Sequence, residues 1–316
     1  MNSQTATYLY SGGFMELKEI DYILTIAECG SISKAADKLL MTQPSLSQFL
    51  QQFESSLGCQ LFLRTTRGVV LTAAGEAFIE DARKIQSLYR EAQTKLRDIN
   101  DVKGGTVRLG ISTFRAQEFL PPILEKFYAM YPDVAVQITE LDTIPLETSI
   151  LEGSLDMGIV AFPLHKLKHD ENVEILLNDE VVIAARKGHP ISRYLHTDDD
   201  GRVWVNFRDA ARFEFVLGPV GTRLGRIARQ QFSACKKIPI TRNDNLTASL
   251  ALAMARRGLA LALTYSSVMS TRNLDFISIG KEGIYLPLAL AYPPSSYRSR
   301  AAIELSKVIH EVLSEN

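Results

Sequence analysis

The sequence predicts an α/β protein with a small helical N-terminal module, one long helix and a larger C-terminal region of alternating strands and helices. Near the N-terminus, two short segments with cap residues at their ends each repeat apolar residues at helical spacing. A proline-free stretch then runs from residue 72 to a Gly-Gly pair at 104–105. Beyond it, apolar strand patterns alternate with helical ones, as expected of a parallel sheet with crossover connections.

Residues 31–58 predict a helix-turn-helix. Ser33 is the expected N-cap of the first helix, and the turn follows at residues 40–42. Thr42 is expected to cap the second helix, with Pro44 near its first position and Gly58 in the left-handed position after its end. The inward faces are apolar and comprise Ile32, Ala35, Ala36 and Leu39, then Leu46, Leu50, Phe53 and Leu57.

The outward face of the second helix is polar and rich in amides, with Gln43, Ser45, Ser47, Gln48, Gln51 and Gln52. Such side chains can read base edges in the DNA major groove. The alternative is the solvent face of an ordinary helical hairpin. Two apolar runs around residues 65–68 predict a β-hairpin wing, which would bring Arg64 and Arg67 to DNA phosphates.

The long helix carries apolar residues at alternating four- and three-residue steps. These are Phe78, Ala82, Ile85, Tyr89, Ala92, Leu96 and Ile99. This spacing is typical of two helices packed along their length and predicts a homodimer seam. The alternative is a single amphipathic helix that lies on its own domain. Thr72 is a candidate N-cap for this helix.

Residues 15–78 resemble the N-terminal module of the LysR-type transcriptional regulators. The resemblance rests on the motifs S-x-x-x-A-A-x-x-L, T-Q-P-S-L-S, L-G-x-x-L-F-x-R and R-G-x-x-L-T-x-A-G. The resemblance implies binding of double-stranded DNA. It also implies that Ser33, Lys34 and Thr42 contact DNA, together with the polar face of the second helix. Members commonly carry Arg where this chain has Gln48 and Gln51, and no Lys or Arg lies between Gln43 and Gln60. Phosphate contacts would then come from Lys34, Lys38, Arg64, Arg67 and helix N-termini.

The composition is that of a globular protein, with 46% hydrophobic residues and 35 basic against 36 acidic side chains. The balanced charge therefore neither supports nor excludes nucleic acid. An odd set of cysteines, Cys29, Cys59 and Cys235, suggests buried thiols in a reducing cytoplasm. Residues 1–14 have neither a signal-peptide nor a membrane-span pattern and are expected to be a loose extension.

The C-terminal region is expected to form two α/β lobes with a ligand cleft between them. Expected strands are 106–111, 134–140, 157–160, 174–185, 213–217, 238–242, 259–263, 274–279 and 286–292, with helices at 118–130, 146–152, 222–234, 246–257 and 299–313. The family resemblance extends loosely here and implies a fold like that of periplasmic binding proteins. The expected divisions are 1–14, 15–72 (winged helix-turn-helix), 73–103 (linker helix) and 106–316 (effector domain), with lobe 1 at 106–177 plus 268–316 and lobe 2 at 178–267.

Residues at strand ends are the candidate ligand contacts. They are Ser112, Thr113, Arg115, Thr143, Gly221, Thr222, Arg223, Asn245 and Thr264. Hydroxyls and helix N-termini can hold an anion, and Arg115 and Arg223 could face a carboxylate, which predicts a small organic anion as effector. The alternatives are helix capping for the hydroxyls, including Asn245 at the start of its helix, and solvent positions for the arginines.

Two strings resemble enzyme or metal motifs, but neither has the partner residues that such a site needs. The S-x-x-K string at residues 31–34 lies in the helix-turn-helix, where capping explains it, and His165 and His169 lack a third metal ligand. The sequence thus predicts no catalysis, cofactor or metal. It predicts a LysR-type regulator that is controlled by a small-molecule effector, and the resemblance adds a tetramer and contact with RNA polymerase. A solute-binding protein or an enzyme on the two-lobed fold is the alternative.

Overall fold

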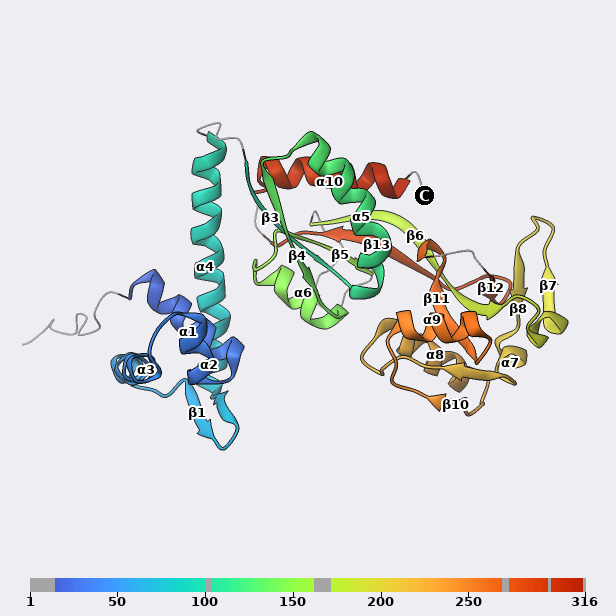
Figure 1. The fold of residues 1–316 in the computed structure, drawn as a ribbon, viewed down its shortest axis with the longest axis horizontal. Coiled ribbons are helices and arrows are strands. Elements are labelled where there is room, and N and C mark those ends of the chain that lie inside the picture. Colours follow the sequence, from blue (N-terminus) through green and yellow to red (C-terminus); the bar gives the residue numbers. More distant parts are fainter. Residues whose placement is uncertain (1–14, 100–103, 162–171, 269–272, 295–296, 315–316) are drawn as a thin grey trace, which may run out of the picture. The chain divides into compact units, whose positions relative to one another are not determined.

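The computed structural model describes residues 15–99, 104–161, 172–268, 273–294 and 297–314 (Figure 1). The chain divides into two compact units, one of residues 1–100 with 152–154, the other of residues 101–151 with 155–316. The N-terminal extension, the two histidines at 165 and 169 and residues 101–103 lie outside the described residues. Within those ranges, no helix is long and apolar enough to span a membrane.

The first unit is a helix-turn-helix with a wing and a long helix. Its elements are α1 (Leu17–Cys29), α2 (Ile32–Lys38), α3 (Gln43–Leu57), β1 (Phe62–Thr65), β2 (Gly68–Leu71) and α4 (Ala73–Ile99). Buried residues of all three short helices, the hairpin and the start of α4 form one core. The rings of Phe49, Phe53 and Phe78 pack in sequence and join α3 to α4. The predicted hairpin is confirmed as antiparallel, with Phe62 opposite Leu71.

In the first unit, the predicted helix caps are confirmed except at one position. The Thr42 hydroxyl accepts a hydrogen bond from the Ser45 amide at 3.3 Å, and Gly58 has φ 70°. Thr72 accepts from the Gly75 amide at 2.9 Å at the start of α4. The N-cap of α2 is Ser31, not Ser33: Ser31 is extended and its hydroxyl faces the Lys34 amide, whereas Ser33 is already helical.

The inward stripe of α3 is shorter than expected. Leu46, Leu50 and Phe53 are buried, but Leu57 is 42% exposed. Leu57 is the last residue of α3, one turn beyond Phe53, and it does not belong to the core of this unit. The prediction that Leu57 faces inward is therefore wrong.

The second unit contains two lobes built on one continuous set of strands. The strands are β3 (Gly105–Ile111), β4 (Val134–Glu140), β5 (Met157–Ala161), β6 (Val173–Arg186), β7 (Leu195–Thr197), β8 (Val203–Val205), β9 (Glu214–Val216), β10 (Ile240–Asn243), β11 (Leu261–Tyr265), β12 (Leu274–Ile279) and β13 (Tyr285–Ala291). The long strand β6 pairs with β13 along residues 173–180 and with β11 and β12 along 181–186. It therefore passes from one lobe to the other, as the extended pattern at 174–185 predicted.

Helices cover both faces of each lobe. They are α5 (Thr113–Met130), α6 (Thr143–Leu151), η1 (Pro190–Tyr194), α7 (Phe207–Ala210), α8 (Arg223–Ala234), α9 (Ala248–Arg257), η2 (Ser266–Val268) and α10 (Arg300–Ser314). In the first lobe α5 and α10 share one apolar core, and α6 covers the opposite face (Figure 1). In the second lobe α8 and α9 likewise belong to separate cores on the two faces.

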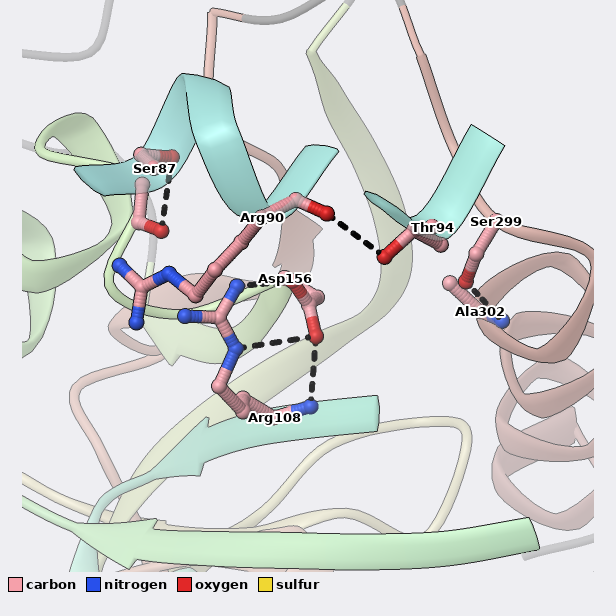
Figure 2. Close-up of polar contacts among 8 residues, drawn as sticks. Ser87, Arg90, Thr94, Arg108, Asp156, Ser299 and Ala302 are labelled. Atoms are coloured by element: carbon pink, nitrogen blue, oxygen red, sulfur yellow. Dashed lines mark hydrogen bonds and ion pairs between the residues drawn. The ribbon is translucent and has the colours of Figure 1, made fainter. Parts of the chain in front are cut away.

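Polar contacts fix the ends of elements in the first lobe (Figure 2). Arg108 on β3 forms an ion pair with Asp156 before β5, and its backbone N–H donates to the same carboxylate at 2.8 Å. Since the Asp156 amide also donates to the Arg108 carbonyl, this pair locks the parallel register of the two strands. The Ser299 hydroxyl accepts from the Ala302 amide at 3.1 Å and caps α10, where the sequence placed the start of that helix.

Several boundaries differ from the expected ones. Strand β12 pairs with β6 and β8 in the second lobe, so the chain returns to the first lobe at β13 and not at residue 268. The sheets are mixed, since β6 and β13 run antiparallel to their neighbours. Helices α5 and α6 begin earlier than expected, directly after the strand ends that precede them. The short elements β7, β8 and α7 were not predicted.

Candidate functional site

The outward face of α3 is open to solvent. Gln43, Ser45, Gln48, Gln51 and Gln52 are exposed, and Ser47 is half-buried. The Ser47 hydroxyl accepts a hydrogen bond from the Arg64 guanidinium at 2.8 Å. This bond joins α3 to the wing, so a cation stands beside the amide face although the helix itself carries none.

The cations expected around this face are not equivalent. Lys38 forms an ion pair with Glu28 at 2.8 Å, so its charge is partly neutralised. Lys34, Arg64 and Arg67 are exposed, and no ion pair involves them within the ranges that the structure describes. Thr42 and Ser33 are exposed at the start of α3 and within α2. The predicted DNA-contacting residues are thus solvent-exposed except for the half-buried Ser47, and three of them, Lys34, Arg64 and Arg67, carry positive charge.

The predicted seam of α4 divides into two parts. Phe78 and Ala82 pack into the core of the first unit, as does Ile79. Further along, Ile85, Tyr89, Ala92 and Leu96 are exposed, and the side chain of Ile99 lies outside the described residues. The alternative of a helix that lies on its own domain therefore holds for the first turns, and an unpaired apolar face remains for the rest.

A cavity of about 360 Å³ lies between the two lobes of the second unit. Its walls are mainly apolar, with residues such as Phe114 and Leu146 from the first lobe and Leu217, Leu246 and Leu263 from the second. The polar lining residues stand mostly at helix starts: Ser112 and Thr113 at α5, Asp142 and Thr143 at α6, Thr222 at α8, and Thr247 and Ser249 at α9. Helix N-termini favour negative charge, so this wall suits an anion.

The capping alternative holds for some hydroxyls and not for others. Thr222 accepts from the Gly225 amide at 3.1 Å and donates to the Pro219 carbonyl at 2.8 Å, so its hydroxyl is occupied. Ser112 is the N-cap residue of α5, yet its side chain forms no cap bond. The Ser112 hydroxyl is therefore better placed for a ligand than that of Thr222.

Arg115 lines the cavity but is not at a solvent position. Its side chain is 2% exposed and forms an ion pair with Asp179 at 2.7 Å. The guanidinium carbon lies 3.9 Å from the centre of the Tyr265 ring, a cation–π contact. The surrounding strands thus hold this arginine in one orientation at the cavity wall.

The remaining candidates lie apart from the lining. Arg223 is half-buried and its guanidinium donates to the Ala161 carbonyl of the first lobe at 3.2 Å, while burial lowers its pKa. Thr264 is fully buried within β11, and Gly221 and Asn245 are exposed outside the lining set. The cap of α9 is Thr247 instead of Asn245. Sequence reasoning missed Thr247 and Ser249, although Thr247 has the residue type of an N-cap.

No metal or disulfide chemistry is evident in the parts that the structure covers. They contain no cluster of three or more His, Cys, Asp and Glu side chains that could hold a metal ion. Cys29, Cys59 and Cys235 are free thiols. The expectation of buried thiols is wrong: Cys59 is exposed directly after α3, and Cys29 and Cys235 are half-buried.

Comparison with known proteins identifies two family models that match this chain. The model of the bacterial regulatory helix-turn-helix protein, lysR family, matches residues 17–76, and the LysR substrate binding domain matches residues 100–314. The chain is 36% identical over 179 residues to the uncharacterized HTH-type transcriptional regulator YcgK of Bacillus subtilis, a match that covers 55% of this chain and 53% of that protein. Matches to two further regulators cover 58% and 61% of their lengths.

Two longer matches cover nearly the whole chain. The uncharacterized HTH-type transcriptional regulator YnfL of Escherichia coli is 26% identical over 303 residues, which is 91% of this chain and 95% of that protein. The crystal structure of full-length CbnR complexed with its target DNA matches with a TM-score of 0.61 at 21% identity, over 94% of this chain and 100% of that chain. At that identity the structural match shows the shared fold. With both family models matched in order along the chain, the protein belongs to the LysR family of bacterial regulatory helix-turn-helix proteins.

Proposed function

We propose that this protein is a sequence-specific DNA-binding transcription regulator controlled by a small-molecule effector in the cavity between its lobes. The observation that carries the proposal is the exposed amide and hydroxyl face of α3 beside the wing arginines, in a chain that matches both LysR family models. Gln48 and Gln51 are suited to pair with adenine edges, while Arg64, Arg67 and Lys34 contact phosphates.

The proposed regulator acts as a dimer. The face of α4 with Ile85, Tyr89, Ala92 and Leu96 is apolar and exposed in the single chain, as a two-helix seam requires. Pairing two helix-turn-helix modules also doubles the phosphate contacts, which matters for a reading helix without cations. Family membership supports further association to a tetramer and contact with RNA polymerase.

The proposed effector is a small organic anion. The cavity has apolar walls, and the starts of α5, α6, α8 and α9 supply hydroxyls and helix dipoles to one ligand. Binding would favour one orientation of the lobes and change the DNA-bound form through the linker at Gly104 and Gly105. The protein would act in the cytoplasm, on chromosomal DNA, without catalysing a reaction.

DNA binding by α3 is tested by measuring the dissociation constant with fluorescence anisotropy. The DNA is an operator selected for binding to this protein, together with point-mutated versions of it, at one stated salt concentration. Gln48→Ala should weaken binding by about 1–3 kcal/mol at particular base pairs and little on operators already mutated there. Arg67→Ala should weaken binding to every sequence alike and reduce the salt dependence. An equal loss on all sequences for Gln48→Ala would contradict base reading by this helix.

A further inference from the structure

A narrow stretch of sheet joins the two lobes of the second unit. The crossover strand β6, which passes from one lobe to the other, pairs there through residues 178–180 with residues 285–287 of β13. Among the described residues, 178–180 have no other strand partner, since the pairing of β6 with β11 begins at Val181. Pro287 has no N–H and offers the sheet only its carbonyl. Fewer backbone hydrogen bonds therefore support β6 here than in the second lobe, where it pairs with both β11 and β12.

The buried carboxylate of Asp179 stands at the centre of this stretch and is held from both lobes. Its Oδ2 accepts from Arg115 Nη2 of the first lobe at 2.7 Å and from the Ser267 hydroxyl of the second at 2.6 Å. Its Oδ1 accepts from the Ser267 amide at 3.0 Å and from the Ser266 hydroxyl at 3.1 Å. Because these bonds converge on one group, the lobes can turn about it as about a pivot.

The second connection between the lobes is a turn that begins and ends with glycine. It runs from Gly280 to Gly283, between β12 of the second lobe and β13, and both glycines have φ 71°. Glycine adopts this left-handed region readily and leaves the backbone more freedom than any other residue. On its own, the turn would therefore be the most flexible point between the lobes.

Arg202, in the loop between β7 and β8, fastens this turn to the neighbouring strands. Its Nη1 donates to the Lys281 carbonyl within the turn at 2.7 Å. Its Nη2 donates to Glu180 Oε1 on β6 at 2.6 Å, and its Nε donates to the Ser278 hydroxyl oxygen on β12 at 3.0 Å. All three guanidinium nitrogens thus have an acceptor, each on a different segment.

This contact is close and mostly shielded from water. The side chains of Arg202 and Glu180 are 27% and 13% exposed, so water screens their attraction less than that of an exposed pair. A Cβ atom at Gly283 would overlap both Arg202 Nη2 and Glu180 Oε1, so the backbone of the turn packs directly against the ion pair. The Asp198 carboxylate accepts from the Arg202 amide at 2.9 Å and holds the loop that carries the arginine.

We propose that Arg202 clamps the glycine turn to the second lobe and thereby places the hinge between the lobes at residues 178–180 and 285–287. With the turn held against β6 and β12, bending is left to the narrow stretch of sheet on the first-lobe side of the clamp. Both connections then bend at one level, so the lobes turn about a single axis. The inference goes beyond the proposed function, because it concerns the lobe hinge whether or not a ligand or DNA is bound.

Two substitutions release the clamp, and a third is the matched control. Arg202→Gln removes the guanidinium, and Glu180→Gln removes the charge that it faces. Since both act on one contact, the double variant should change hydrogen exchange no more than Arg202→Gln does. Arg202→Lys keeps a cation opposite Glu180 and should restore part of the protection. Arg242→Gln is the control, because Arg242 also pairs with a glutamate, Glu214, but is 84% exposed on β10.

The experiment is hydrogen exchange of the full chain without ligand, followed by mass spectrometry with residue resolution. In the wild type, residues 178–180 should exchange faster than the Val181 amide, which donates to the Ile284 carbonyl at 2.8 Å. In Arg202→Gln the Val181 and Gly280 amides should exchange at least about tenfold faster, because the clamp no longer holds the turn. The control variant should exchange like the wild type.

Trp204 shows whether the β7–β8 hairpin itself stays folded. This single tryptophan of the chain lies on β8 opposite Ser278, and its ring stacks on that of His196 with 4.3 Å between the ring centres. Its fluorescence should be unchanged in Arg202→Gln, because the stacked rings are not part of the clamp.

The proposal is overturned if the Val181 amide exchanges at the wild-type rate in Arg202→Gln, or if residues 178–180 are the slower ones in the wild type. It is also overturned if faster exchange spreads through the core strands of both lobes, since Arg202 would then support the fold as a whole. Faster exchange confined to the hairpin, with altered Trp204 fluorescence, would overturn it as well, because Arg202 would then fasten only β7 and β8.

Discussion

Thr264 is a candidate ligand contact by its position at a strand end, but the structure shows it as a buried residue of the sheet. It is fully buried on β11, and its hydroxyl has no hydrogen-bond partner among the residues that the structure describes. Thr264→Val keeps the shape and removes an unsatisfied polar group, so we expect a gain of about 1 kcal/mol in the free energy of unfolding. Urea denaturation of both proteins measures it. A loss of stability would show that the hydroxyl has a partner.

Leu40 adopts a backbone conformation that leucine avoids. It lies in the turn between α2 and α3 with φ 55°, and its side chain is 95% exposed. Asparagine tolerates this left-handed region, and almost no packing is lost with an exposed leucine. Leu40→Asn should therefore stabilise the first unit by about 0.5–1 kcal/mol. Thermal unfolding with Leu63→Asn as an exposed control tests this. A lower melting temperature for Leu40→Asn would mean that the side chain has a packing role.

Glu174 gives the first lobe a pH dependence. Burial raises the pKa of its carboxyl, but hydrogen bonds from His310, Arg298 and Tyr292 outweigh this, so the pKa lies below the usual 4.5. The carboxylate thus stabilises the fold above pH 4.5, and this contribution is lost as the pH falls through the lowered value. Glu174→Gln should be less stable than the wild type at neutral pH, and the difference should shrink in acid. A difference that is constant with pH would contradict this.

At the scale of elements, α4 combines residues that pack into the core with the exposed apolar face of the proposed dimer seam, and one apolar stripe in the sequence does not distinguish the two. The Phe78 and Ala82 positions serve the core of the first unit, whereas Leu96 is 61% exposed. We expect Leu96→Glu to place a charge in the dimer seam and raise the dimer dissociation constant at least about tenfold. Arg97→Glu, at the next exposed position, is the control. Light scattering after size exclusion measures both, and an unchanged dimer in Leu96→Glu would remove this face from the seam.

Local patterns predicted the elements of this chain well where caps and periodicity act within a few residues. Thr42, Pro44 and Gly58 bound α3 correctly because each has a local conformational preference. Ser31 and Ser33 are both suitable caps by type, and only the hydrogen bond to the Lys34 amide decides between them. The strands β7 and β8 escaped prediction because each is only three residues long and depends on its neighbours in the sheet.

The site was predictable in position and less so in detail. Strand ends and helix starts selected Ser112, Thr113, Arg115, Thr143 and Thr222, which line the cavity, while their contact with a ligand stays a prediction. The pairing of Arg115 with Asp179 joins residues 64 positions apart, and no local pattern announces it. The same holds for the return of the chain to the first lobe, since β12 looks like any apolar strand until its pairing with β6 and β8 is known.

At the scale of the whole molecule, the chain combines a proposed DNA-reading face poor in cations with a cavity between the lobes, and the lining of this cavity includes Arg115, the ion-pair partner of Asp179 on the crossover strand. The small number of cations makes DNA binding depend on several contacts at once, because each phosphate contact contributes modestly and is weakened by salt. The cavity between the lobes provides a physical route by which a ligand can favour one lobe orientation. Together they agree with the proposed regulator, for which we expect DNA affinity to depend on assembly and effector, and family membership supports this proposal.

The most direct test is a gel-shift titration of the full chain against the DNA upstream of its own gene, with excess scrambled competitor at a fixed salt concentration. We predict a retained complex that survives the competitor and is lost in a variant with Gln48→Ala and Gln51→Ala together. Retention that disappears with competitor, or that is unchanged in the double variant, would contradict sequence reading by α3 and with it the proposed regulator function.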